Sequence, residues 1–399
     1  MKKLYLMVMG MLMLQATNSN AQCPSGRYMN EIFANYSIDS VTYSTVYGQK
    51  MDIYQPVGDT IAARPLIILA HGGSFVGGDR HADSSVLWLC RNFAKRGYVT
   101  VSIDYRLTNF LGLATAAGAT DEVTKAISDG KAAIRYFMKD RATTNTYKID
   151  TNNIFIGGNS AGAVLYMHVG YLDSIGECSA SIQAAMVANG GFEGNSGNAG
   201  YTTKSRAIIN LAGALNATTM AGPGDKPSVN CQGDLDNVVP FNCGFPISGV
   251  VPVTLCGLGQ LEAAYTSSGI YHMSRVFVGD GHVPWNDDLT KFATVDSLVK
   301  IFLYNMVCVH NTGIDEQAVA NVVKLYPNPA TTYINVEASQ AISTVTICDA
   351  TGRTVREVNN VNHENYELNT AHLASGVYFV RIRFANENYA PLVKRIVIE

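Results

Sequence analysis

Short, uninterrupted apolar segments recur between residues 66 and 278, and segments of helical periodicity lie between them. The apolar segments are the expected strands, at residues 66–70, 99–103, 154–156, 185–188, 208–211 and 276–278. The helical segments are at residues 123–127, 132–137 and 161–172. Such strands are typical of a sheet covered on both faces. The alternation predicts an α/β fold with a mostly parallel sheet, helices on both faces and functional loops at the carboxyl ends of the strands.

Both ends of the chain differ from this alternating region. Residues 28–54 alternate weakly between polar and apolar, which predicts an antiparallel hairpin at the edge of the sheet. After residue 312 a turn-rich segment leads into short strands without helices, which predicts a small all-β sandwich. The expected organisation is a signal peptide at 1–21, a catalytic α/β domain at 22–311, a linker at 312–323 and a β-sandwich domain at 324–399.

The first residues have the pattern of an export signal. Met1-Lys2-Lys3 is basic, residues 4–14 carry no charge, and small residues precede Gln22. The apolar run is shorter than the ~20 residues of a membrane span, so we expect cleavage before Gln22 and no stable membrane span. A lipid anchor on Cys23 is the lesser alternative, because Gln22 fits that processing poorly. The protein is expected to be secreted or at the cell surface, after passage through the periplasm.

Composition limits the kinds of partner. The chain has 47% hydrophobic and 15% charged residues and a formal net charge of −3, which excludes a disordered chain and gives no footprint for nucleic acid. All eight cysteines lie in the exported part, and none has the spacing of a zinc site. We expect disulfides, including a local bridge among Cys231, Cys243 and Cys256, and neither a metal nor a cofactor.

One serine stands between an expected strand and an expected helix. Residues 154–157 lead into Gly158-Asn159-Ser160-Ala161-Gly162, and the helix opens at Ala161. A Gly-x-Ser-x-Gly turn in this position is a nucleophile elbow, in which glycines on both sides relieve the crowding around a strained serine. Ser160 is the expected nucleophile. An ordinary glycine-rich turn is the alternative.

A serine nucleophile needs a histidine base that is oriented by a carboxylate. With a nucleophile elbow the chain order is serine, acid, histidine. His282 follows an expected strand and is the expected base, with His272 as the fallback. The acid is expected to be Asp236, although Asp234 in the same loop is the alternative, which would otherwise cap the turn.

Backbone donors for an oxyanion are expected just after the strand at 66–70. His71-Gly72-Gly73-Ser74 follows it directly, so the N–H groups of Gly73 and Ser74 are expected to act together with that of Ala161. The segment 189–204, rich in glycine and asparagine, is a candidate lid.

Together these motifs resemble the hormone-sensitive-lipase-like and related carboxylesterase branch of the α/β-hydrolases. The resemblance rests on His71-Gly72-Gly73, Asp104-Tyr105-Arg106-Leu107, the elbow and Gly281-His282. It departs at Ser74, where a third glycine is usual, and at Asn159, where aspartate is usual. The acid loop, with Asp236 followed by Val238-Val239-Pro240, is closer to esterases that remove acetyl or feruloyl groups from polysaccharides.

The tail is similar to the C-terminal sorting domain of the type IX secretion system. The likeness rests on Leu325-Tyr326-Pro327-Asn328-Pro329, Gly376-Val377-Tyr378 and the basic last strand at 394–398. It implies the secretion machinery as a partner, and release or attachment at the cell surface, usually with loss of the tail. A carbohydrate-binding or spacer module is the alternative.

The sequence thus predicts a secreted serine carboxylic ester hydrolase. It would act through an acyl-enzyme on a small-molecule or polymer ester, with acetyl, feruloyl and polyester substrates all open. A serine peptidase of the same fold and a catalytically inactive cell-surface binding protein are the alternatives.

Overall fold

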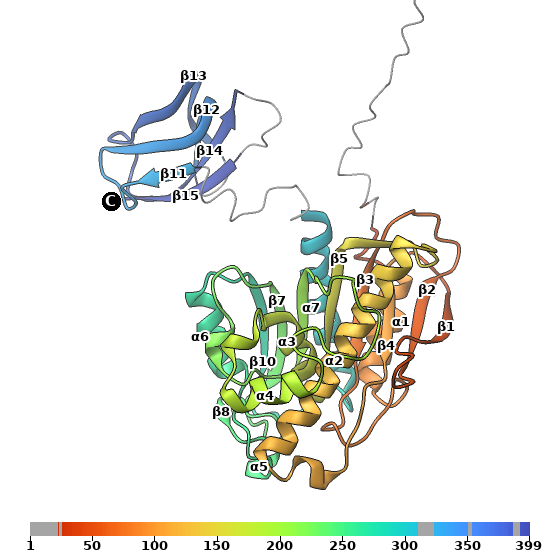
Figure 1. Ribbon diagram of the computed structural model, residues 1–399. Helices are drawn as coiled ribbons and strands as arrows, with labels where there is room; N and C mark the ends of the chain where they lie inside the picture. The colour runs from red at the N-terminus through yellow and green to blue at the C-terminus, as the bar shows by residue number, and fades with distance from the viewer. Residues whose placement is uncertain (1–22, 24–25, 310–322, 350–352, 386–391) are drawn as a thin grey trace, which may run out of the picture. The chain divides into compact units, whose positions relative to one another are not determined.

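The computed structural model describes residues 23, 26–309, 323–349, 353–385 and 392–399 of the chain (Figure 1). The chain divides between Val309 and His310 into two compact units. The expected signal peptide at 1–21 and nearly all of the expected linker at 312–323 lie outside the described residues.

The first unit is built on an eight-stranded sheet with the order β1-β2-β4-β3-β5-β6-β7-β10. Strands β1 and β2 are antiparallel to their neighbours at one edge, as the hairpin pattern predicts, and the other six strands are parallel. The strands are β1 Tyr36–Thr42, β2 Lys50–Pro56, β3 Arg64–Ala70, β4 Val99–Ile103, β5 Ile149–Asn159, β6 Ala207–Leu211, β7 Ser228–Gly233 and β10 His272–Phe277.

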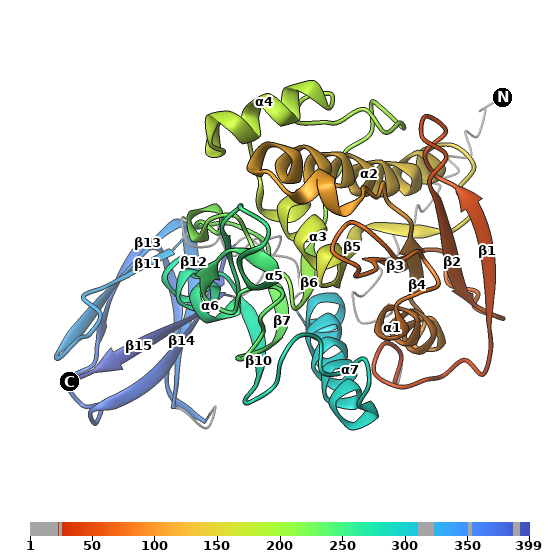
Figure 2. The same ribbon diagram turned by 90° about the horizontal axis from the view of Figure 1, so that it is seen from below.

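Helices cover both faces of this sheet (Figure 2). On one face lie α1 (Ser84–Lys95) and α7 (Leu289–Tyr304), and on the other α2 (Ala116–Ala142) and α3 (Ala161–Tyr171). Alternate strand residues enter different cores because successive side chains point to opposite faces. In β3, Leu66 and Ile68 pack in the core with α2 and α3, whereas Ile67 and Leu69 pack in the core with α1 and α7.

The expected strand at 185–188 is wrong, because these residues end the helix α4 (Ala180–Ala188). Only Met186 is buried in this helix, which lies over α2 on the outside of the unit (Figure 2). The segment is rich in alanine, the best helix former, and is too exposed for a central strand. The loop at 189–204 packs beside it, with Asn198 bonding the Tyr43 and Ala132 carbonyls, and is not a lid over Ser160.

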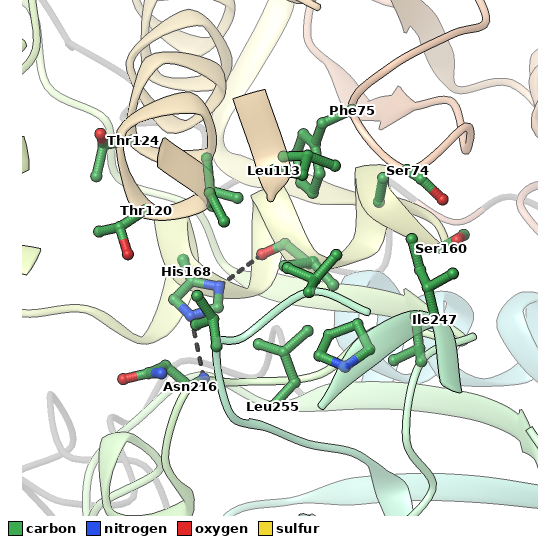
Figure 3. Close-up of a pocket in the computed structure, with 18 of the residues that line it drawn as sticks. Ser74, Phe75, Leu113, Thr120, Thr124, Ser160, His168, Asn216, Ile247 and Leu255 are labelled. Atoms are coloured by element: carbon green, nitrogen blue, oxygen red, sulfur yellow. Dashed lines mark hydrogen bonds between the residues drawn. The ribbon is translucent and has the colours of Figure 1, made fainter. Parts of the chain in front are cut away.

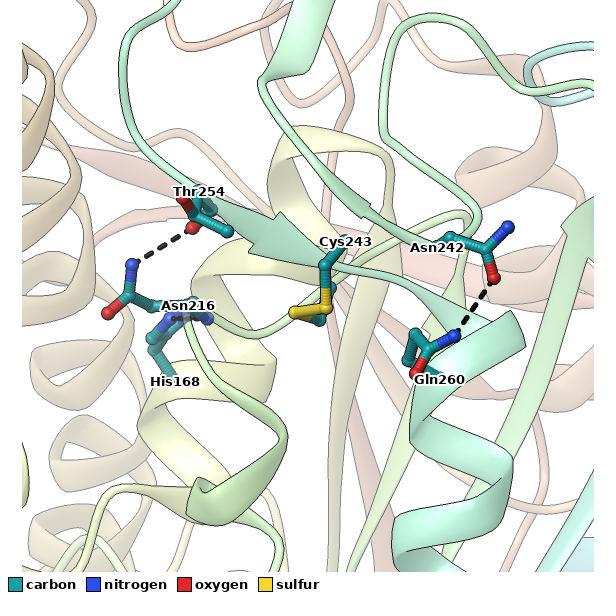
Figure 4. Close-up of a disulfide and its surroundings, with 7 residues drawn as sticks. His168, Asn216, Asn242, Cys243, Thr254 and Gln260 are labelled. Atoms are coloured by element: carbon teal, nitrogen blue, oxygen red, sulfur yellow. Dashed lines mark hydrogen bonds between the residues drawn. A yellow bond between two sulfur atoms is a disulfide. The ribbon is translucent and has the colours of Figure 1, made fainter.

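Several small elements complete the unit. They are the helical turns η2 (Phe110–Leu113), η3 (Ile175–Glu177), η4 (Thr218–Met220) and α5 (Pro246–Gly249), the strands β8 (Cys243–Gly244) and β9 (Leu255–Cys256), and the helix α6 (Leu258–Ser267). A disulfide joins Cys243 in β8 to Cys256 in β9 (Figure 4). The local bridge expected from sequence is therefore confirmed for this pair, while Cys231 is a buried free thiol. A second disulfide joins Cys23 to Cys308.

Helix α7 and the turn that continues it, η5 (Asn305–Val309), are long and apolar enough to cross a membrane by length and composition. Phe292, Val295, Val299 and Phe302 of α7 nevertheless pack into the core beside the sheet. This packing is that of a core helix.

The second unit is antiparallel and all-β, as its sequence predicts. Its strands are β11 (Val323–Tyr326), β12 (Tyr333–Asp349), β13 (Thr354–Asn369), β14 (Gly376–Phe384) and β15 (Leu392–Ile398), and β12 pairs with β11, β13 and β14. Alternate residues such as Val345 and Ile347 are buried in a core of its own.

Candidate active site

Ser160 occupies a sharp turn between β5 and α3. Its backbone has φ 52° and ψ −119°, a conformation that is strained for a residue with a side chain. The flanking glycines are required by close approach of β3, since a Cβ at Gly158 or Gly162 would lie 2.4 or 2.1 Å from the Ala70 carbonyl oxygen. The turn thus holds the Ser160 hydroxyl at the carboxyl edge of the sheet.

His282 and Asp236 reach Ser160 from the loops after two neighbouring parallel strands, β10 and β7. The Nε2 atom of His282 lies 2.8 Å from the Ser160 Oγ, and its Nδ1 lies 2.8 Å from the Asp236 Oδ2. Because a carboxylate only accepts, Nδ1 carries the proton and Nε2 of the neutral ring accepts from the serine hydroxyl. This is the geometry that a general base requires.

Asp236 is held by bonds that the sequence did not reveal. Its Oδ1 accepts from the N–H groups of Val238 and Val239, both at 2.9 Å. Its Oδ2 also accepts from the Gln232 amide at 3.3 Å, and Gln232 in turn bonds the Val239 carbonyl. The Asp236 side chain is fully buried. These donors hold the carboxylate in the position from which it contacts His282.

The two alternatives named from the sequence lie in other places. Asp234 accepts from the Gly279 N–H at 2.7 Å and so caps the turn that precedes His282. The Nδ1 atom of His272 lies 2.9 Å from the Ile270 carbonyl oxygen, and its ring packs near Tyr265.

Two of the three expected oxyanion donors belong to residues that line the pocket at Ser160. Ser74 and Ala161 line the same pocket as Ser160, and Gly73 precedes Ser74 with φ 117°. A Cβ at Gly73 would lie 2.1 Å from the Gly77 carbonyl oxygen, so only glycine fits there. Throughout the described part of the chain, the N–H groups of Gly73, Ser74 and Ala161 meet no acceptor. They are free to bind an oxyanion.

Asn159, one of the two departures from the usual elbow, links three parts of the site. Its Nδ2 donates to the Asp83 Oδ2 at 2.9 Å, and that same oxygen accepts from the Gly72 N–H at 2.9 Å. Its Oδ1 accepts from the Trp285 indole at 3.2 Å. The elbow, the loop after β3 and the loop that carries His282 are therefore joined through one buried amide. Neither Asp83 nor Trp285 was expected from the sequence.

A pocket of about 820 Å³, its open mouth included, begins at Ser160 (Figure 3). It lies between α2, α3 and the segment at 238–255, and aliphatic side chains form most of its wall. Burial lowers the pKa of His168, which lies in the wall at the end of the pocket opposite Ser160. Among the residues that the structure describes, no cluster of three His, Cys, Asp or Glu side chains could hold a metal.

Solved structures of an esterase share this fold. The native esterase 2 of the planctomycete Thermogutta terrifontis is 19% identical over 67% of this chain and 92% of its own, with a TM-score of 0.51. The same esterase phosphorylated by paraoxon is 20% identical over 67% and 94%, and its butyrate-bound form is 19% identical over the same shares, both with a TM-score of 0.51. No curated protein matches the chain. The fold is therefore the α/β-hydrolase fold of these esterases.

Two family models match separate parts of the chain. Residues 51–235 match BD-FAE, an esterase-type domain, and residues 324–399 match the secretion system C-terminal sorting domain. The chain is thus similar to the BD-FAE esterase-type domain over residues 51–235 and to the type IX sorting domain over residues 324–399. The resemblance seen in the sequence motifs is confirmed for both units.

Proposed function

We propose that the protein is an exported serine esterase in which Ser160, His282 and Asp236 form the catalytic triad. The observation that carries this proposal is the continuous chain of 2.8 Å contacts from Ser160 Oγ through His282 to Asp236. The free N–H groups of Gly73, Ser74 and Ala161 beside the hydroxyl support it. The match to the sorting domain at residues 324–399 supports export, and with the signal peptide that we propose at 1–21 the reaction would take place outside the cell.

The reaction follows from these contacts. His282 Nε2 takes the proton of Ser160 while Oγ attacks the ester carbonyl, and the three amides bind the oxyanion of the tetrahedral intermediate. The intermediate collapses to an acyl-enzyme as the imidazolium gives its proton to the leaving alcohol. Water, deprotonated by the same imidazole, then attacks the acyl-enzyme and releases the carboxylic acid. Asp236 keeps the ring in the required tautomer and stabilises the imidazolium.

The test is the labelling of the exported protein by a fluorophosphonate probe, together with turnover of p-nitrophenyl butyrate. Labelling and turnover are expected in the native protein and should both disappear in Ser160→Ala with an unchanged melting temperature. The butyrate-bound form of the Thermogutta esterase supports the choice of acyl group. Native protein that neither labels nor turns over would instead point to an inactive surface-binding protein.

A further inference from the structure

The pocket beside Ser160 follows the axis of helix α3. Ala161, Val164 and His168 on this helix line it after Ser160, so it extends over about two helical turns, or roughly 12 Å. Figure 3 shows Ser160 at one end of the pocket and His168 with Asn216 at the other. The pocket is therefore elongated and begins at the proposed nucleophile.

The wall between these two ends is mostly aliphatic, with the hydroxyl side chains of Ser74, Thr120 and Thr124 as exceptions. Among the lining residues none carries a fixed charge, and Phe75 is the one aromatic ring besides the imidazole of His168. The aliphatic side chains come from helices on one side and from the segment after Asp236 on the other, namely Leu113, Val123, Ile127, Val164, Ile182, Val238, Val239, Ile247, Val251, Val253 and Leu255. A wall of this kind favours an aliphatic ligand through burial of apolar surface.

The far end of the pocket is closed by a neutral imidazole. His168 Nδ1 lies 2.8 Å from the Val164 carbonyl and donates to it, and Nε2 accepts from the Asn216 N–H at 3.2 Å. A proton on Nε2 would face that N–H donor, so these bonds hold the ring in its neutral form. No charge at this end would attract a carboxylate or an ammonium group.

The wall next to Ser160 is fixed by an unusual backbone conformation. Ile247 has φ 54°, which is disfavoured for a β-branched residue. The bonds from Ile247 N to the Val238 carbonyl and from Ser248 N to the Asn237 carbonyl, both 2.8 Å, hold it there. Figure 3 shows the Ile247 side chain at the Ser160 end of the pocket. Backbone hydrogen bonds therefore hold the apolar wall of the channel in place at its Ser160 end.

We propose that the pocket binds a linear aliphatic acyl chain of roughly six to ten carbons, with its carbonyl at Ser160 and its methyl end at His168. The length follows because three bonds of an extended chain span ~3.8 Å, so a pocket of roughly 12 Å takes about nine bonds. This inference rests on the proposed function and names its substrate class. An acetyl group would leave most of the channel empty, and a feruloyl group would bring a hydroxyl to a wall with few polar partners.

The test is the kcat/KM of p-nitrophenyl esters from acetyl to dodecanoyl, with methyl ferulate included, at substrate concentrations below micelle formation. Burial of each methylene in the transition state should raise kcat/KM by about three- to fourfold from acetyl to at least hexanoyl. The rise should stop once the chain reaches His168. A maximum at acetyl, or a preference for methyl ferulate over octanoyl, would overturn the inference.

A matched pair of variants tests whether this pocket is responsible. Val123 on α2 lines the channel, whereas Val187 on α4 is 66% exposed and does not line it. Val123→Trp should lower the ratio of octanoyl to acetyl kcat/KM at least tenfold, and Val187→Trp should leave that ratio within twofold of the native value. Equal ratios in both variants would contradict the assignment.

Failure of the inference is distinguishable from failure of the proposed function. The fluorophosphonate probe reports on Ser160 independently of acyl length. Full labelling together with a chain-length optimum at acetyl would reject the acyl channel alone. Absence of labelling would reject the esterase activity and the channel with it. If Val123→Trp does not fold, the substrate series on the native protein still decides the question.

Discussion

The carboxylate of Asp83 accepts from the side-chain amide of Asn159 at 2.9 Å, and both side chains are buried. The same Oδ2 atom accepts from the Gly72 N–H, in the loop that carries the oxyanion donors. Oδ1 of Asp83 caps helix α1 by accepting from the N–H groups of Ser85 and Val86. A neutral donor at position 159 therefore satisfies a carboxylate that an acidic residue there would repel.

This relationship predicts that Asn159→Asp destabilises the protein although aspartate is usual at this position in the carboxylesterases that the sequence resembles. Two buried carboxylates would share one site, which should lower the free energy of unfolding by about 3 kcal/mol at pH 8. The pair raises the pKa of one carboxyl group in the folded state, so the folded state binds more protons and the loss should shrink as the pH falls toward 5.

Urea unfolding at pH 5 and pH 8 measures this effect. Asn152→Asp, which adds the same charge at an exposed position on β5, is the control and should change the free energy of unfolding by less than about 0.5 kcal/mol. Because the amide also positions the oxyanion loop, kcat should fall more than KM rises in Asn159→Asp. A variant as stable and as active as the native protein would show that the link is dispensable.

The site could be predicted from the sequence where a residue type and its position relative to a strand were enough. Ser160 between a strand and a helix, and His282 after β10, are of this kind. Gln232, Asp83 and Trp285 could not be found in this way, because their roles depend on contacts between segments far apart in the chain. The one sequence signal that pointed to this network was the unusual Asn159 in the elbow.

The fold was predictable where apolar strands are buried on both faces. The prediction of a strand at 185–188 was wrong because a short apolar segment does not distinguish a strand from part of a helix. The five residues that precede it, Ala180 to Ala184, extend the helix to nine residues and were the available signal. The position of the acyl channel depends on how the segment at 238–255 folds over α3, which has no local pattern.

Two buried imidazoles predict that the folded protein loses stability in mild acid. Burial lowers the pKa of His71, and the pKa of His168 is lowered in the same way. Below their ordinary value of about 6.5, the unfolded chain therefore binds more protons than the folded one. The free energy of unfolding should fall as the pH drops from 6.5 to 5, by at most about 1.4 kcal/mol per pH unit for each ring.

Unfolding by urea at pH 5, 6 and 7 checks this slope. In His168→Gln the slope of the unfolding free energy against pH should be smaller, by at most the contribution of one proton, about 1.4 kcal/mol per pH unit. His372→Gln removes an exposed imidazole from the second unit and is the control. An identical slope in the native protein and in His168→Gln would show that His168 does not contribute to the acid sensitivity.

The burial of Lys131 predicts a change of stability at alkaline pH. Burial lowers the pKa of its ammonium group to about 8, and Nζ lies over the Phe192 ring at 3.5 Å and donates to the Phe192 carbonyl. Between about pH 8 and 10.5 the unfolded chain keeps the proton that the folded protein loses. The contribution of Lys131 to stability should therefore increase as the pH rises through this window.

The comparison with Lys131→Met isolates this contribution. The free energy of unfolding of the native protein minus that of the variant should increase by about 1–3 kcal/mol from pH 7.5 to pH 10. Lys139→Met, on the same helix and more exposed, gives the matched control. A difference that stays constant over this range would contradict the assignment of a depressed pKa to Lys131.

The two disulfides predict separable effects on stability and on substrate choice. Cys243–Cys256 closes the segment that supplies Ile247, Val251 and Val253 to the channel wall, and Figure 4 shows it beside the Asn216 contact to Thr254. Cys23–Cys308 joins segments that do not line the channel. Only the first disulfide should therefore influence acyl selectivity.

The double variant Cys243→Ser/Cys256→Ser should lose about 3 kcal/mol of unfolding free energy, as expected for a short closed loop. Its ratio of octanoyl to acetyl kcat/KM should fall, because the wall that buries the chain is no longer held. Cys23→Ser/Cys308→Ser should lose at least as much stability, since its loop of 285 residues is longer, and should keep the native ratio. If both double variants changed the ratio equally, the effect would arise from general loosening of the unit and not from the channel wall.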